Sequence, residues 1–132
     1  MRTLLWLDDF RNPYEDDWLV FSPIHRPFNV VWAKSYDDFV SWIKTNGLPD
    51  GICFDHDLGL GIAIENHKNG MSKRQARKLK KLEKTGMDCA KWLVDYCMDN
   101  DLPLPKFNIQ SSNPVGAENI RSLLYNFNNL NS

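Results

Sequence analysis

The sequence has no long hydrophobic run, no internal repeat and no strong net charge. No stretch approaches the ~20 consecutive apolar residues that a membrane-spanning helix needs, so we expect no membrane as partner. The chain of 132 residues carries 16 Lys+Arg and 17 Asp+Glu, a formal net charge of −1, which predicts no bulk attraction to nucleic acid. Its three cysteines are an odd number without a C-x-x-C pair, which favours reduced thiols and a cytoplasmic protein.

What is present is the composition of a single globular domain over residues 1–132. Hydrophobic residues make up 42% and aromatic residues 12%, enough for a core without disulfides or structural metal. The near-zero net charge hides an asymmetry, because residues 68–84 hold eight basic residues and one acidic residue. The rest of the chain is left with eight basic and 16 acidic residues. We therefore expect an acidic domain that carries a basic insertion, residues 60–84.

The basic insertion allows two interpretations. Ser72-x-x-Gln75 resembles a capping box and predicts the start of a helix with a solvated basic face. Alternatively, the helix contacts nucleic acid or another phosphate-bearing partner, since such charge segregation is typical of interaction segments. The basic side chains that would make this contact are Lys73, Arg74, Arg77, Lys78, Lys80 and Lys81. Aromatic residues are absent from residues 68–84, which argues against base stacking.

Short apolar runs alternate with amphipathic segments along the rest of the chain. The runs predict four strands, at residues 3–7, 28–33, 51–54 and 107–109. Ser35, Thr85 and Asn113 are placed to cap three helices, and the first of these is expected to end near Asn46. This alternation predicts an α/β fold with a mostly parallel sheet of four to five strands, covered on both faces.

Polar clusters follow three of the predicted strands, at the end where parallel sheets form their sites. The clusters are Asp8-Asp9, Asp55-His56-Asp57 and Gln110-Ser111-Ser112-Asn113. If the strands are parallel neighbours, up to four carboxylates share one pocket, and such crowding requires protons or a cation. Hard carboxylate oxygens without a nearby cysteine favour Mg²⁺ over zinc.

Each cluster taken singly also has a plain structural explanation. An Asp-Asp pair after a strand is usually a solvated turn. In extended geometry His56 points away from the face shared by Asp55 and Asp57, where it is a general acid, a phosphate contact or simply a packed residue. Arg11 is either a phosphate clamp or half of a structural ion pair.

The start of the last predicted helix is a further candidate for anion binding. Ser111, Ser112 and Asn113, together with the backbone N–H groups of the helix start, form a natural cradle for phosphate. Helix capping alone explains Asn113 and the Pro114 that follows it, but it does not explain the two adjacent serines.

Together these motifs resemble a receiver domain. The Asp8-Asp9 pair resembles the metal-binding acidic pair of receivers, Asp55 resembles their phospho-acceptor, and Ser111 or Ser112 resembles the hydroxyl residue after a later strand. More specifically, nearly the whole chain resembles the divergent group of cyclic-phosphate processing receiver domains. The segments that carry this resemblance are Leu5-Trp6-Leu7-Asp8-Asp9-x-Arg11-x-Pro13, Phe54-Asp55-His56-Asp57-Leu58-Gly59, Thr85-Gly86-x-Asp88 and Ser112-Asn113-Pro114-x-Gly116. The resemblance implies a flavodoxin-like three-layer sandwich and a role in processing cyclic phosphates, such as those left by RNA or ADP-ribose metabolism.

The sequence departs from this resemblance at two positions. Gln110 stands where the family favours histidine, and an amide cannot replace a proton donor. Ordinary receivers also end their last strand with a lysine before proline, whereas here Asn113 precedes Pro114 and Lys106 lies at the other end of its strand. Phosphorelay signalling is therefore disfavoured.

Two functions of different class follow as hypotheses. In the first, the protein is an Mg²⁺-dependent phosphoesterase acting on a phosphate-containing small molecule or nucleotide. Its metal ligands are Asp8, Asp9 and Asp55, and either Asp55 or a metal-bound water attacks the phosphorus. His56 or Asp57 handles protons. The phosphate-binding residues of this hypothesis are Arg11, Ser111, Ser112 and Asn113.

In the second hypothesis the protein is a non-catalytic binding or adaptor protein that uses its basic helix to contact a partner or nucleic acid. A third interpretation takes Asp55-x-Asp57 as a haloacid-dehalogenase-type motif. It ranks last, because the motif is central in this chain and Gly59 stands where that family usually carries threonine or valine.

Overall fold

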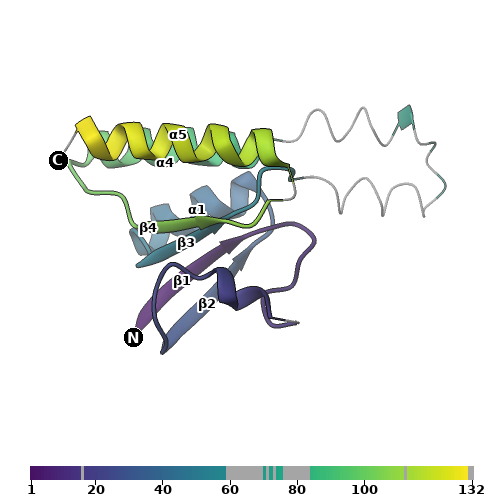
Figure 1. Ribbon diagram of the computed structural model, residues 1–132, viewed down its shortest axis with the longest axis horizontal. Helices are drawn as coiled ribbons and strands as arrows, with labels where there is room; N and C mark the ends of the chain where they lie inside the picture. Colours follow the sequence, from purple (N-terminus) through teal and green to yellow (C-terminus); the bar gives the residue numbers. More distant parts are fainter. Residues whose placement is uncertain are drawn as a thin grey trace.

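A four-stranded parallel sheet forms the centre of the computed structural model. The structure describes residues 1–15, 17–58, 70, 72, 74–75, 84–111 and 113–130. The strands are β1 (Arg2–Leu7), β2 (Phe28–Ala33), β3 (Gly51–Phe54) and β4 (Lys106–Ile109), arranged in the order β2-β1-β3-β4 (Figure 1). This confirms the predicted α/β fold with a mostly parallel sheet, of the flavodoxin-like receiver type.

The register of the strands decides which residues meet at the carboxyl edge. Leu7 pairs with Phe54, and Phe54 pairs with Ile109, so strands β1, β3 and β4 end level with one another. The residues that follow these pairs are Asp8, Asp55 and Gln110. Backbone hydrogen bonds continue one step past the strands, because Asp55 N–H donates to Leu7 O at 2.9 Å and Gln110 N–H donates to Phe54 O at 2.9 Å.

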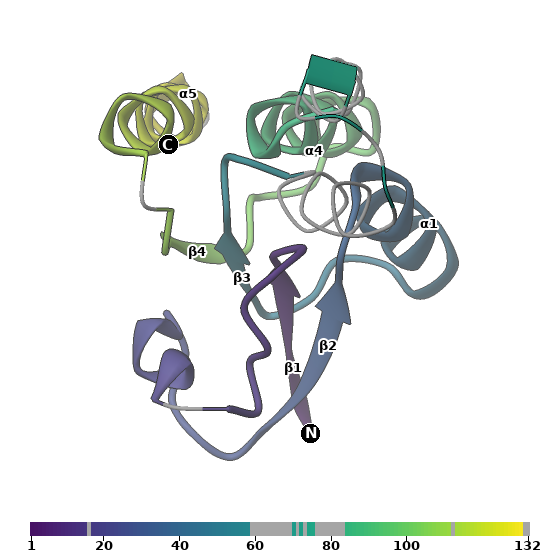
Figure 2. The ribbon, with the colours of Figure 1, turned by 90° about the vertical axis from the view of Figure 1, so that its right-hand side faces the viewer.

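Three helices pack along one face of the sheet, as Figure 2 shows. They are α1 (Tyr36–Asn46), α4 (Gly86–Asp99) and α5 (Pro114–Leu130), and α4 contacts both α1 and α5. All three predicted caps are confirmed. The Ser35 hydroxyl accepts from Asp38 N–H, Thr85 forms a capping box with Asp88, and the Asn113 side chain accepts from Gly116 N–H at 3.0 Å. Buried Leu5, Leu7, Ile52 and Phe54 of the sheet join these helices in the larger core cluster.

The connection between β1 and β2 covers the other face. It contains a short 3-10 helix, η1 (Trp18–Phe21), that the sequence did not predict. Leu4 and Trp6 alternate with the residues that face the helices, so they point to this side and pack with partly buried Trp18 and Phe21. Asn108 Nδ2 of β4 donates to Phe21 O at 2.8 Å, which ties the connection to the sheet.

Most of the basic insertion lies outside the described residues, and so do its predicted helix beyond Gln75 and the basic residues Lys73, Arg77, Lys78, Lys80 and Lys81. Its predicted capping box is present: Gln75 N–H donates to the Ser72 hydroxyl at 3.2 Å, and Ser72 N–H donates to Gln75 Oε1 at 3.3 Å. Arg74 is exposed. Among the described residues, no helix is long and apolar enough to cross a membrane.

Candidate functional site

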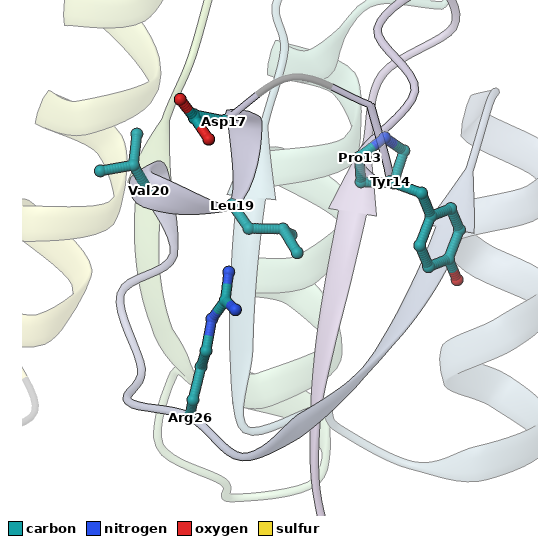
Figure 3. A pocket seen from close by; sticks show the side chains of 6 residues that line it. All are labelled: Pro13, Tyr14, Asp17, Leu19, Val20 and Arg26. Atoms are coloured by element: carbon teal, nitrogen blue, oxygen red, sulfur yellow. The ribbon is translucent and has the colours of Figure 1, made fainter.

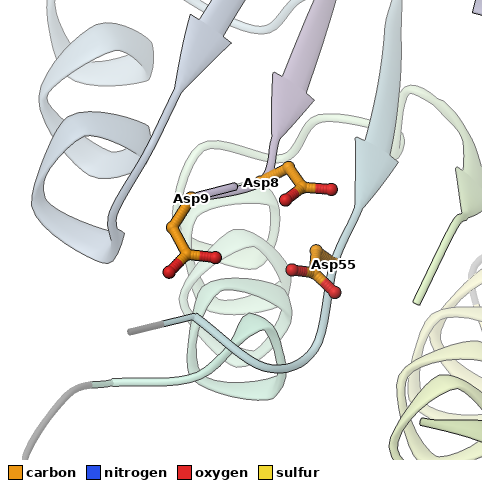
Figure 4. Close-up of side chains that lie close together, drawn as sticks. All are labelled: Asp8, Asp9 and Asp55. Atoms are coloured by element: carbon orange, nitrogen blue, oxygen red, sulfur yellow. The ribbon is translucent and has the colours of Figure 1, made fainter. Parts of the chain in front are cut away.

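Three carboxylates converge at the carboxyl ends of β1 and β3, as Figure 4 shows. Asp8, Asp9 and Asp55 each offer an oxygen, and these three oxygens lie within 4.8 Å of one another. Asp8 is fully buried, Asp55 is 4% exposed and Asp9 is half-buried. These three residues form what we call the carboxylate cluster. The convergence follows from the parallel pairing of β1 with β3. The sequence predicted a mostly parallel sheet and made the convergence conditional on these strands being neighbours.

Asp8 is held in place by its own turn. Its Oδ1 accepts hydrogen bonds from the backbone N–H groups of Phe10 and Arg11, both at 3.0 Å. An aspartate commonly closes a turn in this way after a strand ends. Two tryptophans lock the same segment, because Trp32 Nε1 donates to Asp8 O at 2.6 Å and Trp6 Nε1 donates to Arg11 O at 3.0 Å.

The Arg11 side chain turns back onto the carboxylate cluster. Its Nη1 donates to Asp8 Oδ2 at 3.2 Å and lies 3.7 Å from Asp55 Oδ1. Its guanidinium carbon sits 5.2 Å from the centroid of the Trp18 ring, a cation–π contact. The sequence left two roles open for Arg11, a phosphate clamp and a structural ion pair, and the structure shows the ion pair. Its role in binding phosphate stays a prediction.

One guanidinium does not neutralise the carboxylate cluster. The pKa of Asp55 is raised from 3.8 to about 7, chiefly because burial removes water from the charged form and secondly because Asp8 repels it. Arg11 opposes this rise, and Asp9 and Asp57 add to it. The cluster therefore favours an added proton or cation. Its donors are all hard carboxylate oxygens, and such a donor set fits Mg²⁺.

A second group of side chains adjoins the cluster. His56 Nδ1 lies 2.8 Å from Asp57 Oδ1, and Asn113 Nδ2 donates to the same Asp57 oxygen at 3.3 Å. The Asn113 amide is also 3.4 Å from His56 Nδ1. The expectation that His56 points away from Asp57 is wrong. Strand β3 ends at Phe54, and the chain then turns instead of staying extended.

Asp57 is consequently not a member of the carboxylate cluster. The sequence predicted up to four carboxylates in one pocket, and the structure brings together Asp8, Asp9 and Asp55. Asp57 turns to His56 and has the smallest of the named effects on the pKa of Asp55. The site thus consists of a carboxylate cluster and a neighbouring His56–Asp57–Asn113 group, joined through the backbone of Asp55 and His56.

Two glycines allow helices to approach this backbone closely. A Cβ atom at Gly86, the first residue of α4, would overlap the carbonyl oxygen of Asp55, and Gly86 N–H donates to His56 O at 2.8 Å. A Cβ atom at Gly116, in the first turn of α5, would overlap the ring of His56. The sequence indicated both glycines only as helix-start residues. Their contacts with residues 55–56 depend on the tertiary packing and leave no local signal.

The segment after β4 completes the rim. Gln110 is buried, and its Nε2 donates to Leu7 O at 3.0 Å, whereas its Oε1 has no hydrogen-bond partner among the described residues. The Ser111 hydroxyl accepts from Asn113 N–H at 3.1 Å, so both residues have local roles at the start of α5. Ser112 lies outside the described residues. Binding of phosphate by Ser111, Ser112 and Asn113 stays a prediction.

A separate depression lies on the η1 side of the sheet (Figure 3). Its volume is about 700 Å³, and it is lined by Pro13, Tyr14, Asp17, Leu19, Val20 and Arg26. None of these residues belongs to the carboxylate cluster or to the His56–Asp57–Asn113 group. We therefore place the candidate site at the carboxyl ends of the strands and not in this depression.

Comparison with known proteins identifies one family. Residues 3–126 match the family model described as the cyclic-phosphate processing receiver domain. The match includes β2, β3 and β4, all of β1 except Arg2, and the residues of both groups of the site. No curated protein and no solved structure gives a significant match to the chain.

Proposed function

The chain belongs to the family of cyclic-phosphate processing receiver domains, and on this premise we propose that it hydrolyses a cyclic phosphate with the help of a bound Mg²⁺. The observation that carries the proposal is the convergence of three carboxylates beside the His56–Asp57–Asn113 group. A metal-dependent phosphoesterase combines a cation site with a proton-transfer group within reach of one phosphorus atom.

The cation would be held by Asp8, Asp9 and Asp55. When bound, Mg²⁺ supplies positive charge that polarises a phosphate oxygen and offsets the negative charge of the reacting group. The residues contribute preorganisation, since two backbone N–H groups and two tryptophan side chains already hold the Asp8–Arg11 turn. Burial of Asp8 and Asp55 excludes water and strengthens their interaction with a cation.

His56 is assigned the transfer of a proton. In the tautomer that donates Nδ1–H to Asp57, Nε2 is left as the acid–base atom. Asn113 in turn holds Asp57 through its amide, and the small Gly116 leaves room for the imidazole against α5. This is the arrangement of an acid–base group, its orienting carboxylate and a residue that holds the carboxylate.

The reaction consumes one water molecule and opens the phosphate ring. Water attacks the phosphorus and passes a proton to the Asp55 carboxylate, while the ring P–O bond breaks. The leaving oxygen takes a proton from Nε2 of His56 in its imidazolium form, which becomes the neutral Nδ1–H tautomer bonded to Asp57, and the product is a phosphomonoester. The start of α5 is assigned the anionic phosphate during this step, because a helix N-terminus favours negative charge and the Ser111 hydroxyl is a donor there.

The test is turnover of 2′,3′-cyclic nucleotides and of ADP-ribose cyclic phosphate, followed as phosphomonoester product with and without Mg²⁺. We expect Mg²⁺-dependent hydrolysis that is lost in Asp55→Asn and falls at least about 100-fold in His56→Ala. Asp95→Asn, at an exposed position in the middle of α4, is the matched control and should keep full activity. Absence of turnover with every cyclic phosphate, or full activity in Asp55→Asn, would refute the proposal.

The second candidate function is that of a binding protein that acts through the basic insertion. It is favoured by the concentration of eight basic residues in residues 68–84. Deleting residues 73–81 separates the two functions. Loss of RNA binding with unchanged turnover assigns nucleic-acid contact to the insertion, whereas unchanged RNA binding removes this candidate.

A further inference from the structure

The Arg11 guanidinium already serves the carboxylate cluster as a counter-ion. Its Nη1 bridges the two strands, 3.2 Å from Asp8 Oδ2 and 3.7 Å from Asp55 Oδ1. These two residues, with Asp9, supply the three oxygens that lie within 4.8 Å of one another. A positively charged group of this chain is therefore placed among the oxygens that would hold a divalent cation.

A guanidinium and a divalent cation cannot both occupy this position. Mg²⁺ binds carboxylate oxygens at about 2.0–2.1 Å, which would bring it close to an Nη1 atom that contacts two of the same carboxylates. Two like charges at such separation repel strongly where burial removes the screening by water. Asp8 and Asp55 are both buried, so the repulsion is not relieved by solvent.

The Arg11 side chain is able to leave without any change of the backbone. Its N–H donates to Asp8 Oδ1, and its carbonyl oxygen accepts from Trp6 Nε1, so the main chain is held independently of the guanidinium. The Arg11 side chain is 21% exposed, which leaves it a route to solvent.

We propose that the Arg11 guanidinium and a divalent cation are alternative occupants of the carboxylate cluster, so that Arg11 sets the affinity of the site for divalent cations. The inference rests on the proposed metal site. It assigns Arg11 a role distinct from that of a phosphate clamp, since the side chain competes with the cation before any substrate arrives. The cluster is then partly neutralised in the resting protein and binds Mg²⁺ only at concentrations high enough to displace Arg11.

The experiment measures Mg²⁺ binding directly, on the full-length, metal-stripped protein, by isothermal titration calorimetry. Arg11→Gln removes the competing charge, Arg11→Lys retains it, and Arg121→Gln is a control at a surface ion pair on α5. We expect Arg11→Gln to bind Mg²⁺ at least about tenfold more tightly than the wild type. Arg11→Lys and Arg121→Gln should stay close to the wild-type affinity.

A stability measurement gives a second readout that does not depend on activity. Without metal, Arg11→Gln should melt at a lower temperature than the wild type, because the carboxylates lose their counter-ion, and Mg²⁺ should raise its melting temperature more than that of the wild type.

The outcomes separate this inference from the proposed function. If the wild type binds Mg²⁺ and Arg11→Gln binds it equally or more weakly, the role of Arg11 is refuted while the metal site stands. If calorimetry detects no Mg²⁺ binding by the wild type or by Arg11→Gln, the proposed metal site fails, and the competition fails with it.

Discussion

The charge of Asp55 should make the metal-free protein less stable as the pH rises. The carboxyl group has a pKa of about 7 in the folded protein against 3.8 as its ordinary value. Between these two values the folded protein keeps a proton on Asp55 that the unfolded chain has released. The free energy of unfolding therefore falls as pH increases from about 4 to about 7, and it is independent of this group above that window.

The Asp55→Asn variant converts this dependence into a measurable difference. Asparagine resembles the protonated, uncharged form of aspartate, so it avoids burying a charge beside Asp8 and Asp9. A shift of about three pKa units at about 1.4 kcal/mol per unit predicts that the variant is more stable than the wild type by about 4 kcal/mol at pH 8.5. At pH 5 the predicted gain is only about 1.5 kcal/mol, because Asp55 is still protonated in the folded wild type.

Urea denaturation in the presence of EDTA at these two pH values checks the prediction. Asp95→Asn, on the exposed side of α4, controls for the general effect of removing a carboxylate and should change stability little at either pH. A variant that is less stable than the wild type at the higher pH would refute the reasoning. So would a gain of the same size at both pH values, since that would exclude titration of Asp55 as its cause.

Three further predictions concern residues around the site. Gly86→Ala should lower the free energy of unfolding by about 3 kcal/mol or more, because the new Cβ atom would overlap the Asp55 backbone. An unchanged midpoint of urea denaturation would contradict the close approach of α4 to this backbone. Gly116→Ala should displace the His56 ring, which lowers the free energy of unfolding by about 1–3 kcal/mol and reduces kcat at least about 100-fold. A wild-type kcat in this variant would show that the position of His56 is unimportant. Burial raises the pKa of all three cysteine thiols, so they should react with a thiol reagent in urea but not in the native protein at neutral pH.

Much of the fold was predictable because its signals are local. The four strands coincide with short apolar runs, and Ser35, Thr85 and Asn113 cap helices where their side chains accept from backbone N–H groups three residues on. The convergence of Asp8 and Asp55 was also predictable. It requires only that two strands be parallel neighbours, and a sheet built from strand–helix alternation makes this arrangement common.

Other features depend on contacts that no local pattern encodes. The short helix η1 spans only Trp18–Phe21 and shows no amphipathic period, and its place over the sheet depends on a hydrogen bond to Asn108, which is 87 residues away from Phe21. The direction of His56 was predicted wrongly, since extended geometry was assumed beyond Phe54. Strand β3 ends at Phe54, and α4 packs against the backbone of the next two residues through Gly86.

The sequence by itself determined the strands, the helix caps and the set of polar residues at the carboxyl ends of the strands, because hydrophobic periodicity and capping act over a few residues. Only the tertiary structure decided which of those polar residues interact with one another. It put Arg11 with Asp8 and Asp55 and paired His56 with Asp57 and Asn113. The physical reason is that burial, ion pairing and the close approach of helices at glycine depend on contacts between segments that are distant in the sequence. These contacts form only when the chain has folded.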